Sequence, residues 1–190
     1  ALIQLHSREA SLVLEAREDA PPLWRHLGAR VDAAGLAALA DGRTPASFSL
    51  DDDVPFSTAP PAGLGWFGLP VVTVRRDGRL LVPVWHCTAI DADAQRISLV
   101  LEDAATALRL EQRFALAPGG AILIDASLTN LGARPVSLDH LASALLPLSA
   151  HSAQVVSWHG RHNAELVEAV EPMPRQAWRH RLDQIGRAHV

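Results

Sequence analysis

The chain has 190 residues, 48% of them apolar, and a formal net charge of −4, so it can fold around a core of its own and is not a disordered segment. Its 17 basic residues are all arginines, scattered along the chain, which argues against nucleic acid as the partner because phosphate binding needs concentrated positive charge. No apolar run approaches the roughly 18 residues of a membrane span. The start lacks a signal-peptide layout, and we expect a cytoplasmic protein without a membrane partner.

Most segments predict short β-strands. Residues 11–17 alternate apolar and polar side chains. Asp77-Gly78 separates two strand-like runs, 70–76 and 79–85, and predicts a hairpin because this turn needs positive φ. Further strand-like runs follow at roughly ten-residue spacing, each bounded by turn residues: 97–103, 106–116, 121–131 and 135–148.

The run 106–116 shows most clearly how these strands are buried. Leu108, Leu110, Gln112 and Phe114 share one face, and charged residues occupy the other. This is the pattern of an antiparallel strand with one face in the core and one in water. The predicted fold class is therefore all-β, an antiparallel β-sandwich over residues 1–190.

Two segments depart from this pattern, and a last strand follows them. The Ala/Leu-rich run 31–42 predicts one short helix near 32–41, with Asp32 as its N-cap and Asp41-Gly42 at its end. Residues 43–70 predict a long loop, and loops of this length inside a domain are usually functional or cover something. Alternation over 178–184 predicts a last strand.

Several polar clusters could carry chemistry, but none forms a specific motif. His159 and His162 could share a metal ion only on a helix, and Gly160 with the preceding VVSW run argues against a helix there. Cys87 is expected to be a buried structural residue, and a nucleophilic role is the alternative. His86 is a poor base for it, since neighbours on a strand point to opposite faces. We expect no metal, no cofactor and no catalytic residue.

The acidic residues favour ordinary structural roles. The run Asp51, Asp52 and Asp53 favours a solvated loop over a pair of catalytic carboxylates, because the three are not spaced apart. Glu102-Asp103 lies at a strand end and favours turn chemistry.

An aromatic loop is the better candidate for binding. Trp66 and Phe67 stand between glycines in GLGWFGLP (63–70). Aromatic faces bind the apolar faces of sugar rings, and glycines allow close approach of a ligand. The alternative is that both rings close one end of the sandwich.

These pieces together resemble the N-terminal domain of glycoside hydrolase family 36, the bacterial-type α-galactosidases. Four stretches carry the resemblance in the same order: ASLVLEAREDAPPLWRHLGARV, PPAGLGWFGLPVVTVRRDGR, the run 97–148 and the run 155–190. The third contributes Asp103, Asn130 and Gly132, and the fourth Gly160 and Glu165. One departure is that Trp66-Phe67-Gly68 replaces the acidic-Phe-Arg triplet of many members.

The resemblance implies that this chain is the non-catalytic N-terminal domain of a larger enzyme, and that its fold is a large antiparallel β-sandwich (supersandwich). Family members are retaining glycosidases with two catalytic Asp residues on a TIM barrel, and that barrel would follow residue 190. The domain would pack on its own barrel and support a homo-oligomer. By register, Trp66 and Phe67, with Phe56 as a weaker candidate, would reach an α-galactoside at the mouth of the barrel.

Two alternatives remain open from the residues alone. A stand-alone carbohydrate-binding module would use Trp66 and Phe67 on an isolated sandwich. A purely structural or assembly module would bury the loop and the sheet faces against other chains.

Overall fold

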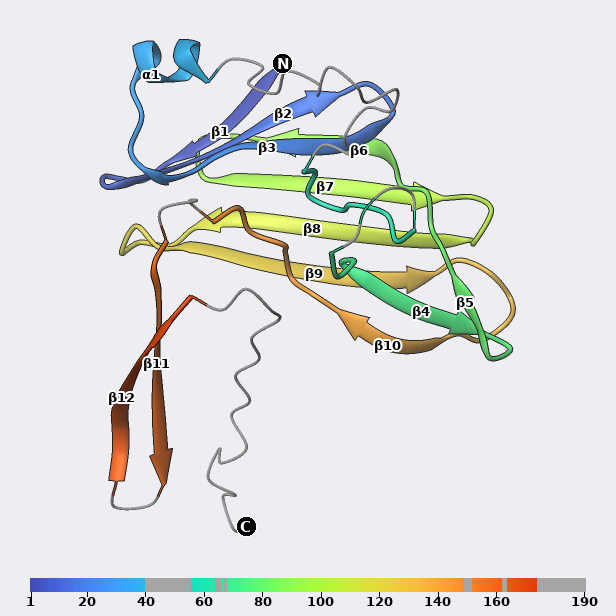
Figure 1. Ribbon diagram of the computed structural model, residues 1–190. Helices are drawn as coiled ribbons and strands as arrows, with labels where there is room; N and C mark the ends of the chain where they lie inside the picture. The colour runs from blue at the N-terminus through green and yellow to red at the C-terminus, as the bar shows by residue number, and fades with distance from the viewer. Residues whose placement is uncertain (40–55, 64–65, 67, 149–151, 162–163, 174–190) are drawn as a thin grey trace, which may run out of the picture. The chain divides into compact units, whose positions relative to one another are not determined.

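The computed structural model describes residues 1–39, 56–63, 66, 68–148, 152–161 and 164–173. The chain divides into two compact units, Ala1–Pro147 and Leu148–Val190 (Figure 1). The secondary structure is nearly all β and the strands pair antiparallel, as the sequence predicted. None of the helices in the described ranges is long and apolar enough to cross a membrane.

The first unit contains a four-stranded sheet and two three-stranded sheets. The four-stranded sheet has the order β6-β7-β8-β9, formed by His86–Ala92, Arg96–Asp103, Leu108–Leu116 and Ile122–Asn130. The second sheet has the order β1-β2-β3, formed by Leu2–His6, Ala10–Arg17 and Ala20–Ala29. The third has the order β10-β4-β5, formed by Ser137–Leu141, Val72–Arg76 and Arg79–Leu81.

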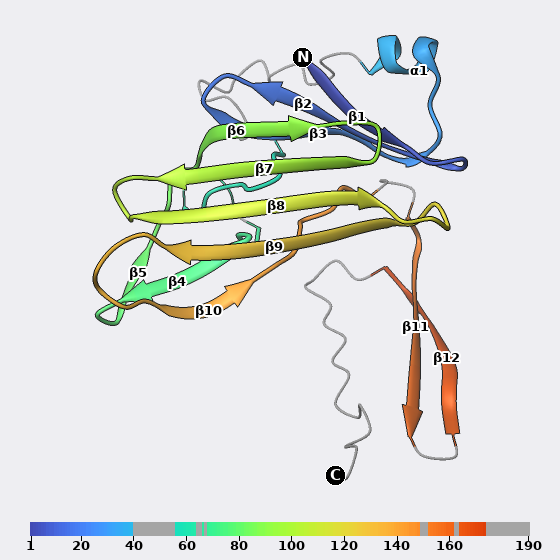
Figure 2. The ribbon, with the colours of Figure 1, turned by 180° about the vertical axis from the view of Figure 1, so that it is seen from behind.

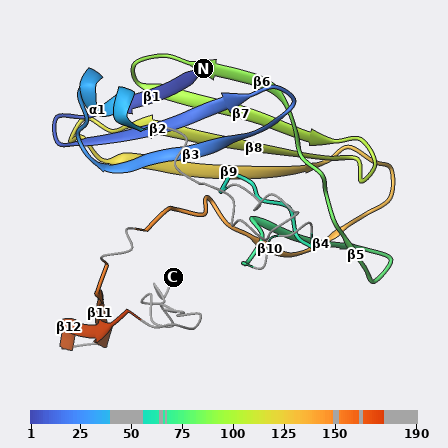
Figure 3. The ribbon, with the colours of Figure 1, turned by 45° about the horizontal axis from the view of Figure 1, so that its top comes forward.

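Both three-stranded sheets pack on the same face of the four-stranded sheet. One core cluster joins Leu12 and Trp24 of the β1-β2-β3 sheet to Ile97 and Phe114. Register places Ile97 opposite Phe114, and Leu101 opposite Leu110, so these residues share one face. The sandwich therefore has one continuous layer and one layer made of two sheets (Figures 2 and 3).

The second core cluster belongs to the other three-stranded sheet. It joins Val72 and Val74 to Leu101, Leu108 and Leu110. The predicted inward row of β8 is confirmed, because Leu108, Leu110, Gln112 and Phe114 are all fully buried.

A short extended segment, residues 56–60, adds to the layer made of two sheets. The Trp24 amide donates to the Phe56 carbonyl (3.0 Å), and the Thr58 amide donates to the Pro22 carbonyl (2.8 Å). This segment therefore pairs with the edge of β3. The Nε2 of Gln112 donates to the Thr58 carbonyl over 3.1 Å, which explains why the inward row of β8 contains one polar side chain: it pairs a buried carbonyl that no strand reaches.

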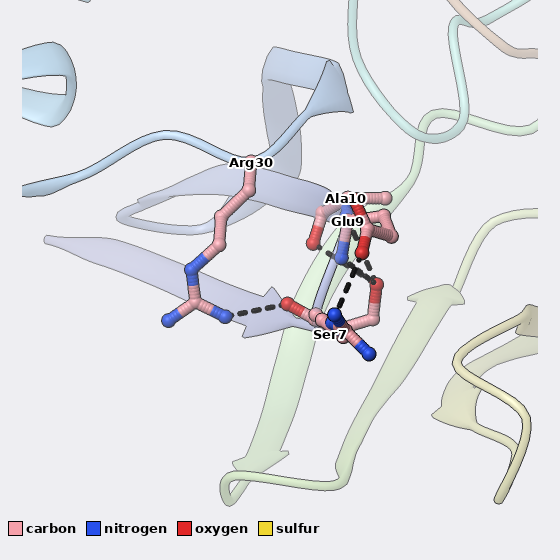
Figure 4. A network of polar contacts seen from close by, with 5 residues as sticks. Ser7, Glu9, Ala10 and Arg30 are labelled. Atoms are coloured by element: carbon pink, nitrogen blue, oxygen red, sulfur yellow. Dashed lines mark hydrogen bonds and ion pairs between the residues drawn. The ribbon is translucent and has the colours of Figure 1, made fainter.

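Side-chain hydrogen bonds and backbone conformation fix the turns. Asp77 and Gly78 have φ of 52° and 77°, and they join β4 to β5 as predicted. In the β1–β2 turn, the Ser7 hydroxyl accepts from the Ala10 amide over 3.0 Å, and Arg30 donates to the Ser7 carbonyl (Figure 4). In the turn after β7, the Asp103 carboxylate accepts from the Ala105 and Thr106 amides. This confirms the turn role that the sequence predicted for Asp103.

Three expected elements differ in length from the prediction. Strand β5 ends at Leu81, because Pro83 has no amide hydrogen for a ladder. Strand β10 covers only Ser137–Leu141 of the expected run 135–148. The helix α1 spans Ala33–Ala38, and its predicted N-cap is confirmed by the 2.8 Å bond from the Gly35 amide to Asp32. The helix ends before the expected Asp41-Gly42, with Leu39 as its C-cap, and Asp41, Gly42 and the strand over 178–184 lie outside the described residues.

The second unit contains a hairpin of β11 (Gln154–Arg161) and β12 (Ala164–Pro172). This confirms that the segment with His159 is not helical. The Trp158 side chain is 51% exposed in this chain.

Candidate functional site

The aromatic candidates Trp66 and Phe56 lie against each other. Their rings stack with centroids 5.5 Å apart and planes 14° apart. Phe56 also packs against the core cluster that contains Trp24 and Phe114. Trp66 is therefore fixed to the sandwich through Phe56, although both side chains stay partly exposed. Phe67, the other main candidate, lies outside the described residues.

The backbone of Gly68 and Leu69 also contacts the Trp66 indole ring. The Trp66 Nε1–H donates to the Leu69 carbonyl over 3.1 Å. A Cβ at Gly68 would lie only 2.7 Å from Cζ2 of Trp66. Glycine is thus required at position 68 for the chain to pass so close to the ring. With its N–H already bonded, Trp66 can offer a ligand mainly apolar ring surface, as sugar-binding aromatic residues do.

The Cys87 and His86 pair is separated as strand geometry predicts. Cys87 pairs with inward-facing Leu101, and His86 with outward-facing Glu102. The His86 Nδ1 lies 3.0 Å from the Asp19 carboxylate. Burial raises the pKa of the Cys87 thiol, the hydrogen bond with the Ala89 backbone offsets part of this rise, and the nearby Asp19 carboxylate adds a smaller increase. Cys87 is half-buried rather than fully buried, and its raised pKa disfavours the thiolate that a nucleophile needs.

Of the two candidate metal-binding histidines, His159 and His162, the structure describes only His159. His159 Nε2 lies 3.3 Å from the Ser157 hydroxyl, and His162 lies outside the described residues. In the part of the chain that the structure describes, no group of three or more His, Cys, Asp or Glu side chains could hold a metal ion. Asp51, Asp52 and Asp53 also lie outside that part.

Sequence reasoning missed a hollow of about 370 Å³ on the outer face of the four-stranded sheet. Its charged lining comes from three strands: Asp91, Arg96, Glu111 and Arg113. Arg96 lies 3.1 Å from Asp91, and Arg113 lies 3.9 Å from Glu111. The charges largely neutralise one another, so no carboxylate is left for acid–base work. Alternation identifies these residues as outward-facing, but only the strand register brings them together.

A second hollow, of about 120 Å³, lies beside Trp85. It is lined mostly by apolar and small side chains, among them Ala59, Pro61 and Val84. It is far smaller than the 300–1,000 Å³ of typical small-molecule sites. Among the described residues, the Trp66–Phe56 stack therefore remains the strongest candidate site.

Residues 20–179 match the model of the glycosyl hydrolase family 36 N-terminal domain. The chain belongs to this family. An α-galactosidase from Escherichia coli is 25% identical over 167 residues, which cover 85% of this chain and 23% of that protein. The chain thus spans about a quarter of the length of that relative. The family match confirms the resemblance to glycoside hydrolase family 36.

Solved structures show the same fold. The family 36 α-galactosidase AgaA from Geobacillus stearothermophilus matches with a TM-score of 0.76 at 18% identity, over 92% of this chain and 28% of that one. The α-galactosidase from Lactobacillus brevis matches with a TM-score of 0.69 at 17% identity, over 91% of this chain and 27% of that one. These likenesses confirm the predicted antiparallel sandwich fold.

Proposed function

We propose that this family 36 chain is the non-catalytic N-terminal part of an enzyme that hydrolyses terminal α-galactosides with retention of configuration. The observation that carries the proposal is the family match over residues 20–179, together with an α-galactosidase as relative. Retention requires two carboxylates about 5–5.5 Å apart. These belong to the catalytic barrel, which lies in the larger part of the enzyme.

Turnover of an aryl α-galactoside tests this proposal. We expect no turnover by residues 1–190 alone and clear turnover by the full-length polypeptide, because the nucleophile and the acid/base lie on the barrel. Turnover by the isolated chain would contradict a non-catalytic role. An inactive full-length polypeptide would contradict the substrate class. Calorimetric binding of α-galactosides by the isolated chain would instead favour a stand-alone carbohydrate-binding module.

The domain's contribution to the enzyme is structural and local. It packs on the barrel, supports a homo-oligomer in the cytoplasm and supplies Trp66, with Phe67, to the sugar site. The support for Trp66 is its geometry: it is partly exposed, stacked on Phe56 and held by the Leu69 carbonyl. A ring fixed in advance loses little conformational entropy when it contacts a ligand.

Replacing Trp66 by alanine in the full-length enzyme should lower kcat/KM about three- to tenfold. Aromatic contacts contribute about 0.5–1.5 kcal/mol beyond the area that they bury, and 1.36 kcal/mol corresponds to about tenfold in rate. Steady-state kinetics on an α-galactoside measures the change, mainly in KM if the ring binds ground and transition states equally.

The matched control for this variant is Leu69→Ala, which truncates a side chain that is 55% exposed three residues along the same loop and keeps the carbonyl that Trp66 uses. Trp66→Phe should recover part of the loss, because it restores an aromatic face. Unchanged kinetics in Trp66→Ala together with lower thermal stability would assign Trp66 to packing on Phe56 alone.

A further inference from the structure

Strand β9 is an unusual edge strand. It is nine residues long and pairs with β8 through Ile122 to Asn130 without a register shift. Among the strands that the structure describes, β9 has β8 on one side and none on the other (Figure 2). Its free side therefore presents a long, regular row of backbone donors and acceptors, which is a template for another strand.

The other edges of the first unit are shortened, bulged or covered. Strands β1, β5 and β10 have only five, three and five residues. Strand β6 contains a bulge between Cys87 and Ala89, and β3 is paired along part of its edge by Ser57 and its neighbours. Strand β9 has no proline, no basic residue and no bulge, and its one charged side chain is Asp125. Within the part of the chain that the structure describes, β9 therefore lacks the usual protection of an exposed edge.

The inward side chains of the four-stranded sheet become less buried toward β9. The inward residues Leu99 of β7 and Leu110 of β8 are fully buried, whereas Ile124 and Leu128 of β9 are only partly buried although they face the same core. Leu138 of β10, opposite the buried Val74, is 51% exposed. Strands β9 and β10 lie on the same side of the first unit (Figures 1 and 2). The described residues therefore leave the apolar core partly uncovered on that side.

We propose that a strand from the larger part of the same polypeptide, C-terminal to this chain, pairs with the free edge of β9 and extends the four-stranded sheet. This rests on the proposed function in one respect, that the chain is the N-terminal part of a longer enzyme. The solved relative AgaA is covered only to 28% of its length, so ample chain exists to supply the strand. A tethered strand also acts at a high effective concentration, which a second copy does not have.

The side chains of β9 define the strand that fits. Its inward positions, beside Ile124 and Leu128, must be apolar, because they continue the core row. Its outward positions beside Asp125, Ser127 and Thr129 must be polar, because these side chains face outward, whereas the position beside the exposed Leu123 can be apolar. Asp125 stands opposite Arg113 of β8, but the structure shows no hydrogen bond or ion pair from Asp125 to another described residue, so the matching position on the added strand favours arginine or lysine as its partner. Opposite charges on neighbouring strands stabilise a pair.

Amide hydrogen exchange of the full-length polypeptide and of residues 1–190, both at low micromolar concentration, tests the pairing. We expect about half of the amides of Ile122–Asn130 to exchange at least about 100-fold more slowly in the full-length protein, because edge amides without a partner are open to water. Amides of the interior strand β2 provide the internal control, with equal exchange in both forms. Equal exchange of β9 in both forms would overturn the proposal.

Two further outcomes concern the identity of the partner strand. Protection of β9 in residues 1–190 that increases with protein concentration would identify a second copy and overturn the proposal. Protection in the dilute isolated chain would place the partner inside residues 1–190, with the same consequence. Asp125→Asn in the full-length protein should reduce the protection by up to about fivefold, because it removes one charge of an opposite-charge pair on neighbouring strands, while the turn variant Asp93→Asn should not.

Hydrolysis of an aryl α-galactoside by the same full-length sample separates this inference from the proposed function. An active enzyme with an unprotected β9 edge overturns only the strand pairing. An inactive protein with a protected β9 edge overturns only the substrate class and supports the pairing.

Discussion

Replacing Phe114 by alanine should lower the free energy of unfolding of the chain by about 3–5 kcal/mol. Phe114 is fully buried, and its ring meets Trp24 edge-on with centroids 5.8 Å apart and planes 86° apart. The side chain joins the four-stranded sheet to the β1-β2-β3 sheet, so its loss leaves a cavity between two layers that cannot easily close. Since domains are stable by only about 5–15 kcal/mol, this loss is a large fraction of the total.

Urea unfolding followed by circular dichroism measures this loss. The matched control is Leu123→Ala on the neighbouring strand β9, because Leu123 is 58% exposed and its truncation opens no cavity. We expect the control to stay within about 0.5 kcal/mol of the wild type, as for ordinary surface substitutions. Equal losses in the two variants would mean that Phe114 does not join the two layers.

Replacing Asp103 by alanine should lower the free energy of unfolding by roughly 1.5–3 kcal/mol, the range for hydrogen bonds to charged groups. The buried Asp103 carboxylate accepts from the Ala105 amide (3.2 Å), the Thr106 amide (3.2 Å) and the Thr106 hydroxyl (2.6 Å). Its removal leaves donors without a partner in the turn between β7 and β8. Urea unfolding followed by tryptophan fluorescence measures the change.

Asp93 offers a matched control for this turn. It accepts from the Gln95 amide (2.7 Å) and the Arg96 amide (2.8 Å) in the turn between β6 and β7, but it is exposed. Because water can replace it there, Asp93→Ala should cost much less than Asp103→Ala. Asp103→Asn should fall between the two, since one oxygen acceptor remains. A larger loss in Asp93→Ala than in Asp103→Ala would contradict burial as the cause.

The candidate site was predictable only in part. Trp66 and Phe67 stand out locally because two aromatic residues between glycines are rare in a loop. Phe56 gave a weaker signal, and nothing in the sequence indicated that its ring would stack on Trp66. Such a contact depends on how the loop returns to the sandwich, and that path is set by packing rather than by neighbouring residues.

The hollow lined by Asp91, Glu111 and Arg113 was likewise only partly predictable from the sequence. Alternation gives the face on which each residue lies, because the side-chain period of a strand is two. The register between strands decides which charges meet, and it depends on turns and bulges along the whole sheet.

By itself, the sequence determined the fold class, the inward row of β8, the Asp77-Gly78 hairpin and the Asp32 cap, since each depends on local periodicity or turn chemistry. The tertiary structure alone decided that two sheets share one face of a third, that Gln112 pairs with the Thr58 carbonyl, and that no described strand pairs with the outer edge of β9. These features join residues far apart in the chain. Their free energies come from packing and from satisfying buried polar groups, which local patterns do not encode.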